Sequence, residues 1–374
     1  MSRFPAHQAQ LAALEARGRT RALSPAQGLD FASNDYLGLA GSELLRDAAH
    51  QALARGVPLG AGGSRLLRGN HPEFEALETE AAAFFASGAA LFMGGGFQGN
   101  LALFASLPRA GDLVLHDALI HASAHDGLRH SRAEHRPFRH NDAADARAVL
   151  QGWRRAGGTG RIWIAVESLY SMDGDFAPLD ALADLAREND AVLVVDEAHA
   201  TGLYGHQGRG LSHAIDDVAL IALHTCGKAL GVSGALITAD KVVIDCLINR
   251  ARPFIYATAP SPLNAALVRA SLAALQERPA LIARAGALRA HAAKEARDLC
   301  GLDPAPSQII PLPVGDDHEA LTLAAHLQAA GFDIRAIRPP TVPKGTARLR
   351  ISITGSLDPA AITAAFRTIA ATRS

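Results

Sequence analysis

The chain has 374 residues, 49% of them hydrophobic, and its 36 basic and 37 acidic side chains nearly cancel. This length and apolar fraction predict one large domain and a smaller one, and they exclude a disordered or fibrous protein. A net charge near zero predicts no general attraction to nucleic acid or to acidic membrane surfaces. The cysteines, Cys226, Cys246 and Cys300, are odd in number and widely spaced, which favours a reduced protein over a disulfide framework.

The first thirty residues predict an amphipathic helix around Leu11, Leu14 and Leu23, followed by an arm. They lack the basic start and apolar run of a secretory signal, so we expect a cytoplasmic protein. The uncharged stretch 81–108 is long enough to span a membrane. It contains five glycines as well as Ser, Gln and Asn, so we expect no membrane helix there.

Short apolar runs alternate with helix-like segments between residues 89 and 239. Apolar runs of four to six residues without internal alternation predict strands buried on both faces, as in a parallel sheet. Strand and helix in turn predict an α/β sheet with helices on both sides, in which ligands bind beyond the carboxyl ends of the strands. The predicted strands are 89–93, 112–116, 161–166, 191–195 and 219–223.

After Pro262 the pattern changes to long Ala/Leu/Arg helices and then two strand-like segments, 309–314 and 348–353. This change predicts a separate, smaller α+β domain. The expected regions are a helix and arm at 1–40, a large cofactor-binding α/β domain at 41–265 and a C-terminal α+β domain at 266–374.

A glycine-rich turn, Gly94 to Gly99, joins the first predicted strand to a helical segment. Backbone N–H groups at the start of a helix lie at the positive end of its dipole and can bind phosphate. The turn also fits the dinucleotide pattern G-x-G-x-x-G, with Asp117 where a ribose-binding acid would lie. A tight packing turn with no ligand is the alternative.

Asp196 ends the strand predicted at 191–195, and His199 follows three residues later. A carboxylate at this edge is costly unless it meets a cation or a strong donor, so Asp196 is a candidate site residue. It could instead cap a helix. The letters Asp-Glu-Ala-His also occur in helicase-type nucleotidases, but the chain has no G-x-x-x-x-G-K-[ST] loop, so we do not expect that function.

Lysine is rare, with four residues against 32 arginines, which limits the candidates for chemistry that needs an amine. Lys228 follows the strand 219–223 in His-Thr-Cys-Gly-Lys-Ala-Leu-Gly, among small and apolar residues. Desolvation there is expected to lower the pKa of Lys228 and to favour a neutral amine that can form an imine. The other lysines are Lys241, which has an ordinary surface context, Lys294 and Lys344.

A series of histidines runs from His116 to His140. His121 and His125 are four residues apart and could bind a metal on one helix face, but no H-E-x-x-H pattern accompanies them, so we expect no metal. Most of these histidines are expected to lie on the surface or to pack in the core, and one to face a ligand.

Together these segments resemble the pyridoxal-phosphate-dependent enzymes of the aspartate-aminotransferase fold, fold type I, and specifically the α-oxoamine synthases. The resemblance covers nearly the whole chain. It implies a mostly parallel central sheet flanked by helices, a smaller C-terminal α+β domain and an N-terminal helical arm. The segments that carry it are SNDYLGL (33–39), GAGGSRLLRGNHPEFEALE (60–78), GGFQGN (95–100), IHAS (120–123), ESLYSMDGDFAPL (167–179), DEAHATGLYGHQGRG (196–210), HTCGKALGVSG (224–234) and RPPTVPKGTARLRISIT (338–354).

The resemblance implies roles around pyridoxal phosphate. Lys228 would bind the cofactor as an imine and later move the α-proton of the amino acid. Asp196 would pair with the pyridine nitrogen, His199 would bond the phenolic oxygen, and His121 would stack on the ring. The other implied cofactor contacts are Gly96, Phe97, Ser171, Thr225 and Thr258.

The segment 338–350 most resembles family members that condense L-alanine with a pimeloyl thioester, pimeloyl-CoA or pimeloyl-acyl carrier protein, in biotin biosynthesis. The resemblance implies that Arg350 receives the amino acid carboxylate and that His121 and Thr341 also contact substrate. Arg21 would lie near the acyl donor, with Arg19 as its competitor because the N-terminal arm is short.

A homodimer with a shared active site is also implied. The segments 60–65 and 256–260 resemble family segments that cross the two-fold interface, and Thr258 would reach the neighbouring phosphate alone because Ala257 cannot donate.

Two other reactions stay open. One is acyl transfer to glycine, as in 5-aminolevulinate synthase or 2-amino-3-ketobutyrate ligase; the other is a nicotinamide-dependent dehydrogenase built on Gly94 to Gly99.

Overall fold

The structure, a computed structural model, describes residues 3–373, which form two compact units. The large unit consists of residues 37–170 and 176–283. The small unit consists of the N-terminal residues up to 36, residues 171–175 and the residues from 284 onwards. The division predicted along the chain, at residues 40 and 265, stays a prediction, since these units are grouped by contacts in space.

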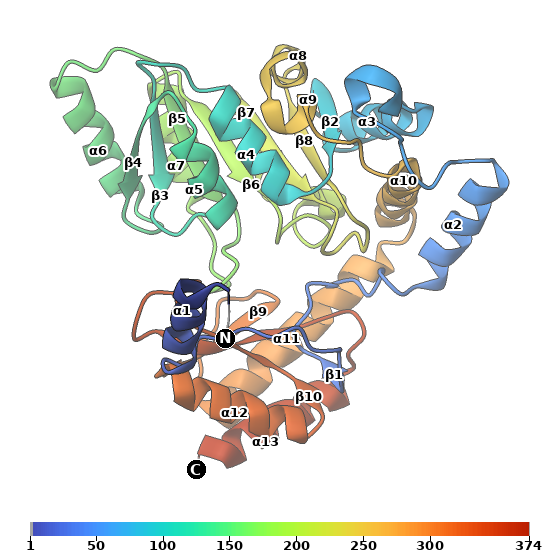
Figure 1. Ribbon diagram of the computed structural model, residues 1–374, viewed down its shortest axis with the longest axis vertical. Helices are drawn as coiled ribbons and strands as arrows, with labels where there is room; N and C mark the ends of the chain where they lie inside the picture. Colours follow the sequence, from blue (N-terminus) through green and yellow to red (C-terminus); the bar gives the residue numbers. More distant parts are fainter. Residues whose placement is uncertain (1–2, 374) are drawn as a thin grey trace. The chain divides into compact units, whose positions relative to one another are not determined.

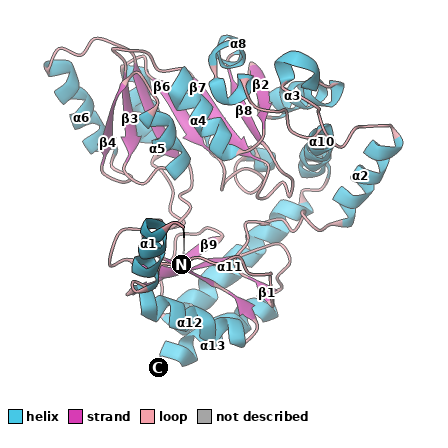
Figure 2. Cartoon of the chain, viewed as in Figure 1, coloured by secondary structure: helices cyan, strands magenta, loops and turns pink. Residues whose placement is uncertain are grey.

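A seven-stranded sheet forms the centre of the large unit, in the order β2-β8-β7-β6-β5-β3-β4 (Figures 1 and 2). Within this sheet β8 runs antiparallel to both neighbours and the other pairs are parallel, so the predicted mostly parallel sheet is confirmed. The strands are β2 (Ala89–Met93), β3 (Leu113–Asp117), β4 (Glu134–Phe138), β5 (Ile162–Glu167), β6 (Val192–Asp196), β7 (Ala219–Thr225) and β8 (Ala235–Ala239).

Successive side chains of the central strands alternate between two hydrophobic cores, one on each face of the sheet. In β6, Val192 and Val194 belong to one core, and Leu193 and Val195 belong to the other. By the same alternation Asp196 projects to the face of Val194. Helices α4 (Gly96–Ser106), α5 (Ala122–Arg129) and α8 (Lys241–Arg250) contribute to that core, and α6 (Ala143–Arg155) and α7 (Leu179–Glu188) to the opposite one.

Polar caps set the start of several helices in the large unit. Ser42 accepts a hydrogen bond from the backbone of Leu45, and Asp240 accepts one from Val242. The remaining elements of this unit are α2 (Glu43–Ala54), η1 (Arg65–Gly69), α3 (Pro72–Phe84), η2 (His206–Gly208), η3 (Ser212–Ala214), α9 (Arg252–Ile255) and α10 (Pro262–Glu277).

The small unit contains an antiparallel sheet in the order β11-β12-β9 and a parallel pair, β1 and β10. Its core packs these strands against the long helices α11, α12 and α13. The strands predicted at 309–314 and 348–353 are β9 and β12. The bounds are β1 (Leu29–Asp30), α11 (Ala280–Cys300), β9 (Ile309–Gly315), α12 (Asp317–Ala329), β10 (Phe332–Asp333), β11 (Arg335–Ile337), β12 (Ala347–Ser352) and α13 (Pro359–Arg373).

The N-terminal helix is shorter than expected. Helix α1 (Pro5–Glu15) includes Leu11 and Leu14 but ends before Leu23, and none of its residues is buried. Gly18, shortly after the helix, has a φ of 61°, a left-handed conformation that leaves the helical path and that other residues rarely adopt.

The uncharged stretch 81–108 forms the end of α3, strand β2 and helix α4. Over residues 3–373, no helix combines the length and the hydropathy that a membrane crossing requires. The stretch is uncharged because it builds part of the core of the large unit.

Candidate active site

Asp196 lies at the carboxyl edge of the central sheet, on the face covered by α4 and α5. Its oxygens accept hydrogen bonds from Asn100 Nδ2 at 2.8 Å and from the backbone N–H of Ala198 at 2.9 Å. Residues 198–203 form turns rather than a helix, so Asp196 does not cap a helix. The strand end and the Asn100 amide therefore hold a carboxylate in a fixed position.

Lys228 lies in the turn that follows β7, and its Nζ is 2.8 Å from Nε2 of buried His199. The turn is closed by a hydrogen bond from the backbone N–H of Gly231 to the carbonyl of Lys228 at 2.9 Å. Gly231 has a φ of 68°, and a Cβ there would lie 2.5 Å from the backbone of Ala40, so only glycine fits. Because β6 and β7 are adjacent parallel strands, their carboxyl ends bring the motifs of Asp196 and Lys228 to one edge.

His121 precedes α5 and caps it. Its Nδ1 accepts a hydrogen bond from the backbone N–H of Ser123 at 3.2 Å and lies 2.7 Å from Ser123 Oγ. Desolvation lowers the pKa of His121, the Asp196 carboxylate raises it, and the Lys228 amine lowers it. The imidazole thus lies within electrostatic range of both groups, and its lowered pKa favours a neutral ring at pH 7.

Helix α4 begins at Gly96 and provides an anion-binding end. The backbone N–H groups of its first turn have no partners within the helix. A Cβ built on Gly95 would meet no atom within 4 Å, and one built on Gly96 would lie 3.6 Å from Thr225 Oγ1. The exposed start of α4 and the Thr225 hydroxyl therefore lie side by side, as expected for two phosphate-binding groups. Phe97, the next residue, is 52% exposed.

The predicted substrate residues Arg21, Thr341 and Arg350 all belong to the small unit. Arg21 Nη2 donates to Thr341 Oγ1 at 3.3 Å, so the structure brings these two together. Arg19 instead forms an ion pair with Asp317 at 2.7 Å. This contact leaves Arg21 as the better candidate for the acyl donor.

Arg350 is buried, at 7% exposure, and bonded within the small unit. Its Nε donates to the carbonyl of Ser171 at 2.6 Å, and Nη1 donates to Ser352 Oγ at 2.6 Å. Its Nη2 donates to Asn34 Oδ1 at 3.1 Å and to Tyr36 OH at 3.2 Å. Ser171 therefore contacts Arg350 through its carbonyl, and a cofactor contact of its hydroxyl stays a prediction.

Thr258 lies on the surface of the large unit in the loop 256–260. The backbone N–H of Ala259 donates to the carbonyl of Gly63 at 2.9 Å, so this loop and the segment 60–65 meet in one subunit. Tyr256 and Leu67 beside them are 72% and 82% exposed. The two segments proposed to cross a dimer interface thus form one surface.

The geometry does not support two other interpretations. Asp117 is fully buried and accepts hydrogen bonds at 2.8 Å from His140 and from the backbone of Leu119 and Asn141, so it cannot bind a ribose. His125 packs edge-on against the ring of His116, at 5.2 Å between centroids. Across the described part of the chain, no three His, Cys, Asp or Glu side chains are arranged to hold a metal ion.

Asn100 is a site residue that no sequence pattern singled out. Its side chain is 3% exposed and donates both to Asp196 and, at 3.0 Å, to Ser123 Oγ, which contacts His121. The available signal was an amide in the otherwise apolar helix that follows the glycine-rich turn. A buried amide needs partners of its own, so it indicates polar groups opposite.

Comparison with known proteins agrees with this arrangement. Residues 26–369 match the family described as aminotransferase class I and II. An 8-amino-7-oxononanoate synthase from Methylobacterium nodulans is 40% identical over 93% of this chain and 91% of the relative. One from Anaeromyxobacter dehalogenans is 38% identical over 95% of this chain and 92% of the relative.

Solved structures give the same result. A serine palmitoyltransferase from S. paucimobilis, with a bound PLP–myriocin compound, aligns with a TM-score of 0.88 at 25% identity, over 98% of this chain and 96% of that one. An 8-amino-7-oxononanoate synthase from Francisella tularensis aligns with a TM-score of 0.77 at 27% identity, over 92% of this chain and 98% of that one. The predicted fold type I is therefore confirmed.

Pyridoxal phosphate is the cofactor of this fold family, and the groups of the large unit fit it. The start of α4 and the Thr225 hydroxyl suit a phosphate, the Lys228 amine suits an aldehyde, and the fixed Asp196 carboxylate suits a pyridine nitrogen. The match over 26–369 and the relatives near 40% identity show that the chain belongs to the aminotransferase class I and II family, in the branch of the 8-amino-7-oxononanoate synthases.

Proposed function

We propose that the chain condenses L-alanine with a pimeloyl thioester to give 8-amino-7-oxononanoate, carbon dioxide and the free thiol carrier. The observation that supports this most is the cluster of Lys228, His199 and Asp196 at one sheet edge, in a chain whose relatives bear the name of this synthase. The carrier is CoA or an acyl carrier protein. The pathway is biotin biosynthesis.

Lys228 is the proposed base. Its Nζ would hold the cofactor and, once alanine has displaced it, take the proton from the Cα of alanine and later return a proton to the same carbon. The 2.8 Å contact with His199 Nε2 keeps the amine oriented at the sheet edge. Bound pyridoxal phosphate supplies an electron sink for the pair of electrons left on that carbon.

Asp196 is the proposed partner of the pyridine nitrogen. A carboxylate held by Asn100 and by the Ala198 backbone cannot turn away, so it keeps a proton on that nitrogen. His199 would bond the phenolic oxygen, and neutral His121 would cover the ring and face the substrate. In these proposed roles the three side chains act by their position and charge at the carboxyl edge of the central sheet.

The phosphate would bind where α4 begins. Gly96 and Phe97 present backbone N–H groups there, and Thr225 adds its hydroxyl. Ser171 is the further proposed hydroxyl donor to the cofactor. The absence of a side chain at Gly95 and Gly96 lets a phosphate approach the backbone closely.

The small unit would supply substrate recognition. Arg350 is proposed to bind the alanine carboxylate, and the contact between Arg21 and Thr341 is the proposed place of the acyl donor. A guanidinium binds a carboxylate through two parallel N–H bonds.

A product assay tests the proposal. The purified enzyme is given alanine or glycine, each with pimeloyl, succinyl or acetyl thioesters of CoA or of carrier protein, and thiol release and the amino ketone are measured. Alanine with a pimeloyl donor should give the highest kcat/KM. Preferred turnover of glycine with succinyl or acetyl donors would instead assign the chain to one of the glycine-using synthases.

The active site is proposed to be shared in a homodimer. The surface that joins the segments 60–65 and 256–260 exposes Leu67 and Tyr256, and Thr258 beside them would reach the phosphate of the neighbouring subunit. Mixing Lys228→Ala subunits with Thr258→Ala subunits should restore activity above that of either variant, because hybrid dimers then contain one intact site. An active monomer in sedimentation at assay concentration would contradict the shared site.

The cytoplasmic location of the protein stays a prediction.

A further inference from the structure

Four polar side chains of the large unit form one hydrogen-bonded chain at the candidate active site. Asn100 Nδ2 donates to Asp196 Oδ2 at 2.8 Å and to Ser123 Oγ at 3.0 Å. The Ser123 hydroxyl lies 2.7 Å from Nδ1 of His121. Asn100 and Ser123 are 3% and 0% exposed, so water does not compete for these bonds. The chain therefore connects the proposed partner of the pyridine nitrogen with the residue proposed to cover the ring.

Close packing of α4 and α5 brings these side chains together. Asn100 belongs to α4, and Ser123 lies in the first turn of α5. Gly127, one turn further along α5, lets the two helices approach each other. A Cβ built on Gly127 would lie 2.9 Å from the backbone oxygen of Asn100 and 2.9 Å from the Cβ of Phe104. A larger residue there would separate the helices and the polar side chains that they carry.

The direction of each hydrogen bond follows from the groups involved. The Asn100 amide nitrogen carries two N–H groups, and its two contacts use both. The Ser123 oxygen accepts one of them, so the hydroxyl proton can point to the imidazole of His121. The backbone N–H of Ser123 also points to Nδ1 of His121, at 3.2 Å. A backbone N–H can only donate, so this Nδ1 is an acceptor and carries no proton.

These contacts select one form of the His121 ring. A neutral imidazole that accepts at Nδ1 carries its proton on Nε2. A proton on Nδ1 would instead face the backbone N–H of Ser123, which places two donors against each other. Among the described residues of the large unit, Nε2 of His121 has no hydrogen-bond partner. Its N–H is therefore left for a bound ligand.

We propose that Ser123 is a positioning residue that holds His121 neutral, with the ring proton on Nε2. Asn100 orients the Ser123 hydroxyl for this contact and holds Asp196 with its second N–H. One hydrogen-bonded chain thus presents a fixed carboxylate and a fixed N–H donor to the site. The inference rests on the proposed function, in which His121 covers the cofactor ring. Ser123 is fully buried and acts through His121.

Nitrogen-15 NMR of the holoenzyme, labelled at histidine, measures the form of the ring directly. The two ring nitrogens have different chemical shifts in the two neutral forms, and the His121→Gln variant identifies the signals of His121. The wild type at pH 7 should have its proton on Nε2. This measurement needs no substrate, so it stands even where the product assay assigns a different amino acid or acyl donor. It also stands if a Ser123 variant does not fold.

Ser123→Ala removes the hydroxyl and keeps the backbone N–H. Because the hydroxyl already accepts from Asn100, it is placed to donate to a neutral His121 ring rather than to accept from a charged one. Its loss should therefore favour protonation of the ring. The ratio of charged to neutral His121 at a fixed pH should rise about two- to tenfold, the range expected for one hydrogen bond.

The pH profile of turnover gives a second measure of the same change. A ring that is charged more readily needs a higher pH to become neutral, so the acid limb of kcat/KM for alanine should move to higher pH in Ser123→Ala. The titratable groups near His121 are Asp196, Lys228 and His125. They stay the same in the variant, so the change reports the hydroxyl alone.

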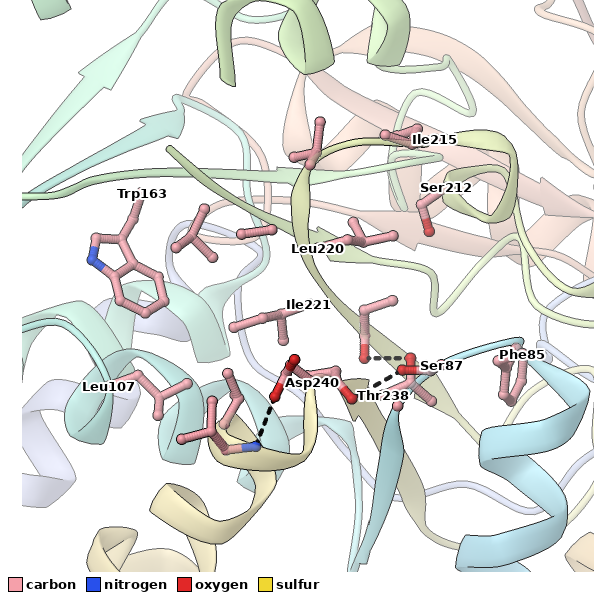
Figure 3. A pocket seen from close by; sticks show the side chains of 18 of the residues that line it. Phe85, Ser87, Leu107, Trp163, Ser212, Ile215, Leu220, Ile221, Thr238 and Asp240 are labelled. Carbon is pink, nitrogen blue, oxygen red and sulfur yellow. Dashed lines mark hydrogen bonds between the residues drawn. The ribbon is translucent and has the colours of Figure 1, made fainter. Parts of the chain in front are cut away.

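Ser87→Ala is the matched control, because it also removes a serine hydroxyl from the large unit. Ser87 precedes β2 and lines a pocket at the edge of the sheet where the parallel strands begin (Figure 3). Its hydroxyl donates to the carbonyl of Ala239 at 3.1 Å. The control should keep the wild-type ratio and pH profile. A proton on Nδ1 of His121 in the wild type would overturn the proposal, and so would a Ser123→Ala variant that loses stability but keeps both the ratio and the profile.

Discussion

Lys228 and Arg350 are both assigned functional roles by the same family resemblance, yet they lie in different kinds of environment. In the large unit the contacts connect functional groups to one another: Lys228 to His199, and Asp196 to Asn100. In the small unit Arg350 donates four hydrogen bonds to groups of the unit itself. An arginine has five N–H donors, so few remain for a substrate.

The two residues are therefore held in two different ways. At the edge of the parallel sheet, strand ends bring reactive groups together and their contacts serve the chemistry. Arg350, in contrast, is part of the packing of the small unit, and a carboxylate would have to displace or share its partners Asn34 and Tyr36. Changes at Lys228 should therefore affect turnover, whereas changes at Arg350 should affect both turnover and stability.

The largest effect is expected for Lys228→Ala. Loss of the only amine at this edge should lower kcat by roughly three to four powers of ten, because proton transfer and cofactor attachment both depend on it. The melting temperature should stay close to that of the wild type. Borohydride reduction and peptide mapping check the assignment, with Lys241→Ala as the control. Label on Lys241, Lys294 or Lys344 would show that another lysine holds the cofactor.

Asp196→Asn tests whether the carboxylate acts by its charge. The amide keeps the shape and the contact region of Asn100 but cannot keep the pyridine nitrogen protonated. Breaking a buried ion pair costs about 3–5 kcal/mol, which corresponds to a decrease in kcat of roughly two to four powers of ten. NMR in deuterated water measures the rate of proton exchange at the Cα of alanine. A rate equal to that of the wild type would contradict this role.

Much of this edge could be predicted from the sequence because its signals are local. The apolar runs at 89–93, 191–195 and 219–223 are β2, β6 and β7. Asp196 directly follows the second run, and Lys228 lies in the turn after the third. Strands β4 and β8 were not predicted. The first, EHRPF, is a polar strand at the edge of the sheet. The second is antiparallel to β7 and follows it without an intervening helix, so it does not fit the alternation of strands and helices.

The partners of Arg350 were unpredictable for a different reason. Asn34 and Ser171 are more than 170 residues away from it along the chain, and no periodicity in one segment indicates contacts at that distance. The alternation in β12 places Arg348 and Arg350 on one face, and it cannot show which one is buried. The structure shows that Arg350 is.

Asn100→Ala tests whether the amide of Asn100 positions the carboxylate of Asp196. Asn100 acts through Asp196 as a positioning residue, and a hydrogen bond to a charged group contributes roughly 1.5–3 kcal/mol, so kcat should decrease about ten- to a hundredfold. The KM for alanine should change little, because the amide does not lie in the small unit with Arg350. The control is Asn249→Ala, an exposed amide of α8. A decrease in stability without a change in kcat would make Asn100 purely structural.

Arg350→Lys tests whether Arg350 contributes both to the stability of the small unit and to the binding of alanine. A lysine cannot reproduce the four bonds, so the variant should lose about 2–4 kcal/mol of stability and should also show a higher KM for alanine. Arg348→Lys is the matched control: it keeps a positive charge opposite Asp173 and should lose much less of both. Urea unfolding and steady-state kinetics measure the two effects. If Arg348→Lys raises the KM more than Arg350→Lys, Arg348 is the residue that binds the carboxylate.

The smallest effect is expected for a histidine that, like Arg350, is buried and makes contacts with neighbouring side chains. His224 lies in β7 next to Thr225, is 2% exposed, and contacts the hydroxyls of Thr201 at 2.9 Å and Thr238 at 3.3 Å. Burial lowers the pKa of His224 to about 3, from 6.5 in an unfolded chain. The folded state therefore holds the neutral ring, so this stabilisation is complete above pH 6.5 and is lost as the pH falls towards 3. Between pH 7 and pH 5 the loss should be about 2 kcal/mol, at roughly 1.4 kcal/mol per pH unit.

His224→Gln removes the titrating ring and keeps a polar side chain in the same place. The decrease in the free energy of unfolding between pH 7 and pH 5 should therefore be smaller in this variant than in the wild type by about 2 kcal/mol. His130→Gln, a change at an exposed histidine, serves as the control and should leave the pH dependence as it is. Urea denaturation at the two pH values measures the difference. An identical slope in wild type and His224→Gln would mean that the buried ring is charged in the folded state, which its two hydroxyl contacts and the stacked ring of Phe85 at 3.7 Å make unfavourable.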